Sequence, residues 1–144
     1  MDYKVYIQDL TEIKWLDEKG ITNVTGREKL YITWKALHCR KQLQTVFLHG
    51  SYIPLYTSAE CGCIAYARQY KNEWALVIAP VSISGIINIK KEQLTDLLLL
   101  LPDNAPVAWE DVLAGVTIVS EKNIPLQKVC KKFPVALLTG KTKN

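Results

Sequence analysis

The residues best suited to chemistry in this sequence are its four cysteines and two histidines, and their spacing matches no metal or nucleophile motif. Cys61 and Cys63 flank a single glycine. Structural zinc sites instead use C-x₂₋₄-C together with a second pair of ligands. His38 and His49 form no H-x₃₋₅-H pair, and nothing nearby in the sequence orients a histidine toward a cysteine. We therefore expect free thiols, no metal site and no cysteine nucleophile on this chain.

The carboxylates are the second group of candidates, because a convergent acid pair could catalyse acid–base chemistry. Asp17-Glu18 and Glu110-Asp111 are neighbours in the sequence. Neighbours on a strand point to opposite faces, so neither pair converges by itself. No dinucleotide-binding, P-loop or nucleophile-elbow motif occurs either. The residues thus predict neither a catalytic residue nor a cofactor site, and no active site on this chain by itself.

Aromatic side chains offer a third possibility, which is stacking on sugar rings. Tyr52, Tyr56 and Trp109 all fall in the part of the sequence that reads as β-structure. Aromatic rings combine a large apolar face with, in tyrosine and tryptophan, a polar handle. We name these three as candidate carbohydrate-binding residues. Packing in the core is the alternative interpretation for each ring.

Composition places the chain among globular proteins of one domain, or one domain with an appendage. The chain has 144 residues, of which 49% are hydrophobic and 22% charged, and a net charge of +4. Such a length can bury its own core. The basic residues are scattered, which does not favour nucleic-acid binding. No signal peptide and no apolar run long enough for a membrane span is apparent, so we expect a cytoplasmic protein with reduced thiols.

Two helices are expected to precede the β-structure, over residues 3–16 and 25–43. Thr25 and Glu28 fit a capping box at the start of the second helix. This helix carries two apolar stripes, which are nearly opposite at 100° per residue. One consists of Leu30, Trp34 and Leu37, the other of Ile32, Ala36, Cys39 and Leu43. A helix on a one-sided core needs one stripe. We therefore expect a partner on each side and an exposed apolar patch on the helices.

From Val46 onward the pattern becomes β-like. Alternation and turn residues predict strands over 52–57, 63–70, 74–79, 109–113, 116–119 and 133–138, with a hairpin across residues 70–73. Residues 94–101 favour a helix by propensity, with a short buried strand as the alternative. A short helix is expected from Pro125 to Lys132.

Several short motifs occur in a fixed order between residues 25 and 138. They are GREKL at 26–30, TWKALHCRK at 33–41, FLHGSYIPL at 47–55, IAYAR at 64–68, WALVIAP at 74–80, LLP at 100–102, WEDVLAG at 109–115 and FPVALL at 133–138. Together they resemble the C-terminal end of maltooligosyltrehalose synthase, a family of the α-amylase clan of glycoside hydrolases. Thr25 stands where the family usually has aspartate, Glu28 where it has an apolar residue, and residues 82–95 match little.

The resemblance implies a fold and a role. The family converts the reducing-end α-1,4 linkage of a maltooligosaccharide into an α,α-1,1 linkage. Its catalytic (β/α)₈ barrel needs about 250 residues, more than this chain has, and its acidic motifs have no counterpart here. The resemblance therefore implies a non-catalytic part of such an enzyme, with a catalytic barrel domain as partner in cis or in trans and possible contact with maltooligosaccharide.

The hydrophobic pattern and the family resemblance together predict how the chain is divided into segments. Residues 1–44 would form a helical segment like the end of the barrel region, residues 45–139 a β-rich C-terminal domain, and residues 140–144 a disordered tail. The fold class is mainly β with helices, an antiparallel, sandwich-like domain preceded by two helices. A free-standing carbohydrate-binding module and a small basic interaction protein remain as alternatives.

Overall fold

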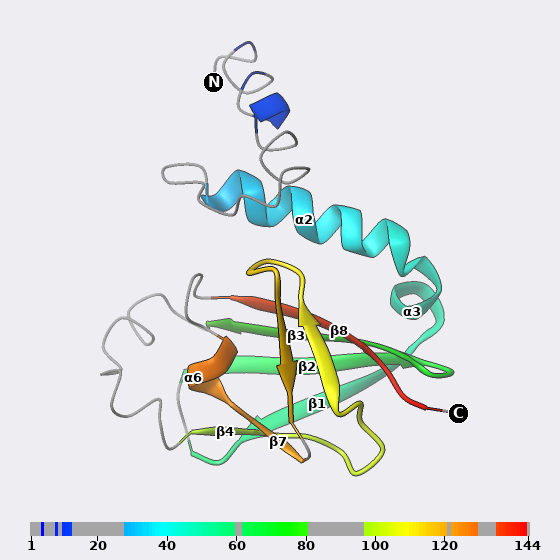
Figure 1. Cartoon of the computed structure of the whole chain (residues 1–144). Coiled ribbons are helices and arrows are strands. Elements are labelled where there is room, and N and C mark those ends of the chain that lie inside the picture. Colours follow the sequence, from blue (N-terminus) through cyan, green and yellow to red (C-terminus); the bar gives the residue numbers. More distant parts are fainter. Residues whose placement is uncertain are drawn as a thin grey trace.

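The computed structural model describes residues 4, 8, 10–12, 28–59, 62–80, 97–120, 122–129 and 135–143. Its helices are α2 (Glu28–Gln42), α3 (Gln44–His49) and α6 (Leu126–Val129). Its strands are β1 (Ser51–Thr57), β2 (Cys63–Tyr70), β3 (Glu73–Pro80), β4 (Leu98–Leu100), β5 (Ala108–Asp111), β6 (Val116–Val119), β7 (Asn123–Pro125) and β8 (Ala136–Lys141). Figure 1 shows α2 and α3 on one side of the strands.

The strands form one sheet in the order β6-β5-β8-β3-β2-β1-β4-β7, and every pairing within the described part is antiparallel. The β2–β3 hairpin closes with Tyr70 opposite Glu73. Lys71 in its two-residue turn has a φ of 54°, as hairpin turns of this length require. The structure thus confirms a mainly antiparallel β fold with a few helices.

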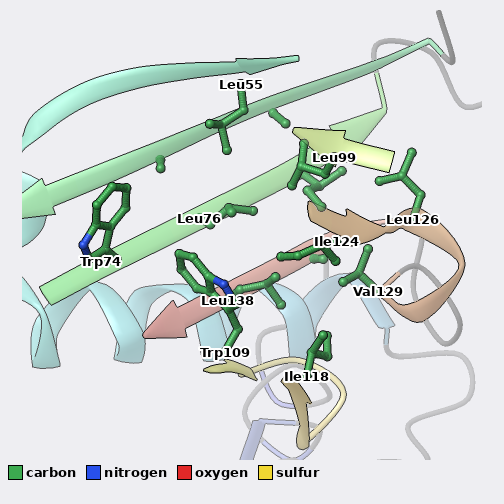
Figure 2. Packing of buried hydrophobic residues seen from close by; sticks show 14 of the residues in the cluster. Leu55, Trp74, Leu76, Leu99, Trp109, Ile118, Ile124, Leu126, Val129 and Leu138 are labelled. Carbon is green, nitrogen blue, oxygen red and sulfur yellow. The ribbon is translucent and has the colours of Figure 1, made fainter. Parts of the chain in front are cut away.

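The sheet curls so that its two edges share one core. Ile118 lies on the edge strand β6 and Ile124 on the opposite edge strand β7, yet both belong to the same buried cluster. Alternate residues of the central strand β3, Trp74, Leu76 and Ile78, point into this cluster. Figure 2 shows these side chains converging from both ends of the sheet. We call this face of the sheet the inner face.

Two tryptophans fill the middle of the inner face. Trp74 on β3 and Trp109 on β5 meet edge to face, with ring centroids 6.3 Å apart and an interplanar angle of 87°. Both side chains are among the largest that are fully buried. Each indole nitrogen is buried and has no hydrogen-bond partner within the described residues. Their contribution to stability is therefore apolar packing.

Most of the predicted strands and the hairpin are confirmed, with two corrections. Val46, predicted to begin β-structure, is a fully buried residue of α3, so helix persists to His49. Of the two alternatives left open for residues 94–101, the structure has the strand, as β4, because β1 and β7 pair with it on both sides. Gly140, predicted in a disordered tail, pairs with Trp74 and Trp109 inside β8.

Other predictions fall partly or wholly outside the described residues. Of the helix expected over 3–16, residues 4, 8 and 10–12 are described and helical. Thr25, the proposed first residue of the capping box, lies outside the described residues. The same holds for residues 81–96, for Cys61 and Cys130, and for residues 130–134 ahead of β8.

Candidate interaction surface between the helices and the sheet

Helix α2 lies on the face of the sheet opposite the inner face, which we call the helix-side face. Its most buried residues, Tyr31 and Cys39, cluster with Leu137 of β8 and with Leu113 from the turn between β5 and β6. Val77 of β3 is partly buried against them. On β3 and β8, inner-face residues alternate with helix-side residues, so one strand supplies both clusters.

A buried hydrogen bond attaches α2 to the β5–β6 turn. The Tyr31 hydroxyl donates to the backbone oxygen of Leu113 at 3.1 Å. Asp111 holds this turn in shape, since its Oδ1 accepts from the backbone nitrogens of Leu113 at 3.0 Å and Ala114 at 3.1 Å. Burial raises the pKa of Asp111, and these two hydrogen bonds act in the opposite direction. The sequence identified Asp111 only as a neighbour of Glu110 and did not predict this role.

A second attachment joins α3 to the sheet. The Arg68 guanidinium donates through Nη2 to the backbone oxygen of Phe47 at 2.8 Å. That carbonyl lies in the last turn of α3, where helix carbonyls lack partners and where a cation is favourable. Gly50 follows the helix at a close approach, because a Cβ there would lie 2.2 Å from the Val46 oxygen and 2.9 Å from the Gln69 oxygen. Helix and strand can therefore meet only with glycine at this position.

The structure explains the two apolar stripes of α2 in a way that the sequence did not predict. Tyr31 lies between the stripes on the helical wheel and is 1% exposed, so both stripes flank a single contact face. All but one of the stripe residues are buried or partly buried within the chain. Leu37 is the exception at 61% exposed, joined by Leu48 of α3 at 55%. On the described helices α2 and α3, the large exposed apolar side chains are thus these two leucines.

An open groove of about 610 Å³ lies beside this contact, between the two helices and the sheet. Its lining is Ile32, Ala36, Leu37, Arg40, Phe47, Tyr52, Tyr66, Arg68, Val77, Ala79, Leu113, Val135, Ala136 and Leu137. A second groove of about 440 Å³ is lined by Leu37, Arg40, Lys41, Gln44, Phe47 and Leu48. Because the two share Leu37, Arg40 and Phe47, we treat them as one helix groove. Its charged lining residues are all cationic.

The helix-side face continues from the groove onto an exposed aromatic surface, and Tyr52 and Tyr66 belong to both. Tyr52 and Tyr66 stack with centroids 5.2 Å apart. Tyr56 stands opposite Leu100 on β4, and Ile64 lies two residues from Tyr66 on β2. Tyr52, Tyr56, Ile64 and Leu100 are all exposed. Alternation along the strands puts these five residues on one face; we call them the tyrosine face.

The three candidate carbohydrate-binding residues divide between the two faces. Tyr52 and Tyr56 are 57% and 70% exposed on the tyrosine face, where a ring could meet a ligand. Trp109 is 1% exposed on the inner face and packs against Trp74. A platform role does not suit a ring buried in the core, so the prediction for Trp109 is corrected to core packing. Sugar binding by Tyr52 and Tyr56 stays a prediction.

Within the described part of the chain, no thiol or carboxylate lines the helix groove or belongs to the tyrosine face. Cys39 is buried under α2, and burial raises its pKa, with Lys35 lowering and Glu110 raising it to a lesser degree. Glu110 is exposed while Asp111 is buried, so this pair points to opposite faces as expected. Among the described residues, no three His, Cys, Asp or Glu side chains lie close enough to share a metal ion. No described helix is both long and apolar enough to span a bilayer.

Comparisons with known proteins bear on the fold. No family model and no curated protein matches this sequence. Among solved structures, the chain is similar to AmyB, a noncanonic maltogenic α-amylase from Thermotoga neapolitana, with a TM-score of 0.50 and 12% sequence identity. The match covers 85% of this chain and 28% of that chain. At this identity the similarity shows the fold alone, and the chain spans little more than a quarter of that protein's length.

Proposed function

We propose that this chain is a non-catalytic β domain of an α-amylase-clan enzyme, and more narrowly of one that forms trehalose-terminated maltooligosaccharides. The observation that carries the proposal is the structural similarity to part of a maltogenic α-amylase over 85% of this chain. The ordered motifs between residues 26 and 138 support the narrower assignment. The catalytic barrel would lie outside these residues, in cis or in trans, and this domain would stabilise it by packing against it.

The distribution of exposed apolar side chains supports a packing role. Tyr52, Tyr56, Ile64 and Leu100 lie together on one face and are each at least 40% exposed. Soluble monomers rarely expose contiguous apolar patches of this kind, and such patches mark interaction sites. A larger domain placed over the tyrosine face would bury them. The role of this chain would then be stability of the assembly, with the chemistry performed by its partner.

The proposal is tested first by enzymology. Incubated alone with maltopentaose, the purified chain is expected to yield no trehalose-terminated product, because the catalytic barrel of this clan needs about 250 residues and this chain has 144. Turnover by the chain alone would overturn the assignment as a non-catalytic domain. The gene supplies the second test. We expect a barrel-encoding region either in the same reading frame as this chain or in an adjacent reading frame. Its absence would contradict the role as a barrel partner.

A second candidate function, carbohydrate binding by a free-standing module, is favoured by the stacked pair Tyr52 and Tyr66. Titration with maltoheptaose would show saturable binding at millimolar ligand, weakened at least fivefold by Tyr52→Ala. Val116→Ala on β6 is the matched control, since it shortens an exposed side chain away from the tyrosine face. No binding at millimolar ligand would eliminate this candidate and leave the packing role untouched.

A further inference from the structure

The helix groove combines an apolar floor with a cationic rim. Aliphatic side chains of α2 and the sheet, among them Ile32, Val77 and Leu137, line the larger part. Leu37 and Leu48 stand exposed beside it. Arg40, Lys41 and Arg68 contribute its charges, and among the described residues no Asp or Glu lines either part. The groove therefore lacks two things at once, namely apolar atoms to fill it and anionic groups to balance its rim.

The two arginines differ in how far the chain itself satisfies them. Arg40 is exposed and makes no hydrogen bond or ion pair within the described part of the chain. Arg68 uses Nη2 on the Phe47 carbonyl, while its Nε is buried and has no hydrogen-bond partner there. A guanidinium has five N–H donors and favours carboxylates, which it can hold by two parallel hydrogen bonds. A ligand that matches the groove therefore carries a carboxylate next to apolar side chains.

Other occupants suit the groove less well. A sugar needs many hydrogen-bonding groups for its hydroxyls, and ten of the fourteen residues that line the larger part have apolar side chains, the others being Arg40, Tyr52, Tyr66 and Arg68. A second copy related by a two-fold axis would bring the same basic rim against itself, and the chain carries a net charge of +4. A nucleic acid would need a broader basic surface than three cations around an apolar floor. An acidic, apolar polypeptide satisfies both deficits.

We propose that the helix groove is a docking site for a polypeptide segment that carries apolar side chains flanked by aspartate or glutamate. The apolar side chains would fill the space against Phe47, Val77 and Leu137, and a carboxylate would pair with the exposed guanidinium of Arg40. The inference does not depend on the trehalose-forming assignment. The occupant is a segment of a separate polypeptide that binds to the chain in trans.

The test is selection of a random dodecapeptide display library on the purified full chain, followed by affinity measurements on synthetic copies of the recovered peptides. Recovered sequences are expected to be enriched in Asp or Glu next to Leu, Ile, Val or Phe. Arg40→Glu should weaken their binding at least tenfold, and Leu37→Ser at least threefold. Both positions are exposed on α2, so the variants retain the fold. Lys128→Glu on α6 is the charge-matched control and should change binding less than twofold.

Four results would overturn the proposal. One is recovery of no peptide above background; another is recovery of peptides without an acidic excess. A third is equal weakening by Arg40→Glu and Lys128→Glu, which would reduce the effect to net charge. A groove filled by a second copy would appear in sedimentation as a dimer that Arg40→Glu dissociates, and this would also contradict the proposal. None of these results bears on catalysis by a barrel partner, so the two proposals fail separately.

Discussion

The two faces of the sheet differ in how completely the chain covers them. On the inner face, both edge strands, the central strands and α6 contribute to one cluster of buried apolar residues. On the helix-side face only Tyr31, Cys39, Leu113 and Leu137 are buried in the second cluster, and most of its other members are partly exposed. The inner face is a finished core, whereas the helix-side face is half covered and continues into the helix groove and the tyrosine face.

The difference has a physical cause in the connectivity. The sheet curls so that residues of both edge strands reach one cluster, and α6 follows directly after edge strand β7 and adds Leu126 and Val129 to it, so the chain itself covers the inner face. The opposite face can be covered only by additional elements, and the described chain places α2 and α3 over part of it. This contrast predicts that the stability of the fold depends mainly on the inner face, while binding of a partner depends on the helix-side face.

The greatest loss of stability is expected from a substitution in the core of the inner face. Trp109→Ala removes a fully buried indole and should lower the free energy of unfolding by about 3–5 kcal/mol, since truncation leaves a cavity among residues that cannot collapse into it. Leu37→Ala on the helix-side face is the matched control and should cost less than about 0.5 kcal/mol. Urea unfolding monitored by far-UV circular dichroism measures both. Similar costs for the two variants would contradict the contrast between the faces.

A smaller effect is expected at the junction of α3 and β1. Gly50→Ala places a methyl group against the backbone oxygens of Val46 and Gln69, neither of which can rotate away. The variant should be destabilised by about 1–3 kcal/mol through forced backbone shifts. Ser51→Ala, one residue along in an exposed position of β1, is the control. Equal unfolding midpoints for the two variants would show that the junction tolerates a side chain.

The attachment of α2 should contribute less still. Tyr31→Phe removes the hydroxyl that donates to the Leu113 oxygen and leaves that buried acceptor without this donor. We expect the free energy of unfolding to fall by about 1 kcal/mol. We also expect the substitution to speed up amide hydrogen exchange more in α2 than in β3. Tyr52→Phe, on an exposed ring, serves as control and should be neutral. Unchanged exchange in α2 would mean that apolar packing alone holds the helix.

The smallest effect is a pH dependence at the β5–β6 turn. The pKa of Asp111 is raised above its ordinary value of 3.8 by burial, so the folded state binds this proton more tightly than the unfolded state. Its stabilising contribution is full below pH 3.8 and is lost as the pH rises through the folded-state pKa. Asp111→Asn keeps a side-chain acceptor and cannot titrate.

The measurement compares the two proteins at several pH values. As the pH falls from 7 toward 4, wild type should gain stability relative to Asp111→Asn, as judged from urea midpoints. Glu110→Gln, on the exposed side of the same strand, controls for general charge effects. A relative loss of wild-type stability on acidification would show that the two hydrogen bonds to Asp111 outweigh its burial.

Local signals predicted the regular elements well and the irregular ones poorly. Alternation along residues 63–70 and 74–79 and the turn between them sufficed for the β2–β3 hairpin, because register and turn chemistry are local. Residues 98–100 required partners from β1 and β7 to become a strand despite five consecutive leucines. Val46 became helical because its side chain is buried where α3 meets the sheet, a contact between distant segments that no local pattern encodes.

The candidate site was predictable only in part. Tyr52 and Tyr56 were named from residue type, and the alternation of β1 then placed both on the exposed face. The same reasoning failed for Trp109, because one strand presents both a buried and an exposed side and residue type does not say which. Arg68 and Tyr31 carried no recognisable signal, since their partners are backbone oxygens of residues 21 and 82 positions away.

By itself, the sequence determined a mainly antiparallel β domain with helices ahead of it, since hydrophobic periodicity and turn residues act over a few positions. It also indicated, through the spacing of its cysteines, histidines and carboxylates, that no familiar catalytic motif is present. Only the tertiary structure decided which face of each strand is covered, because coverage depends on how the sheet curls and where α2 comes to lie. The helix groove and the tyrosine face are products of that incomplete coverage.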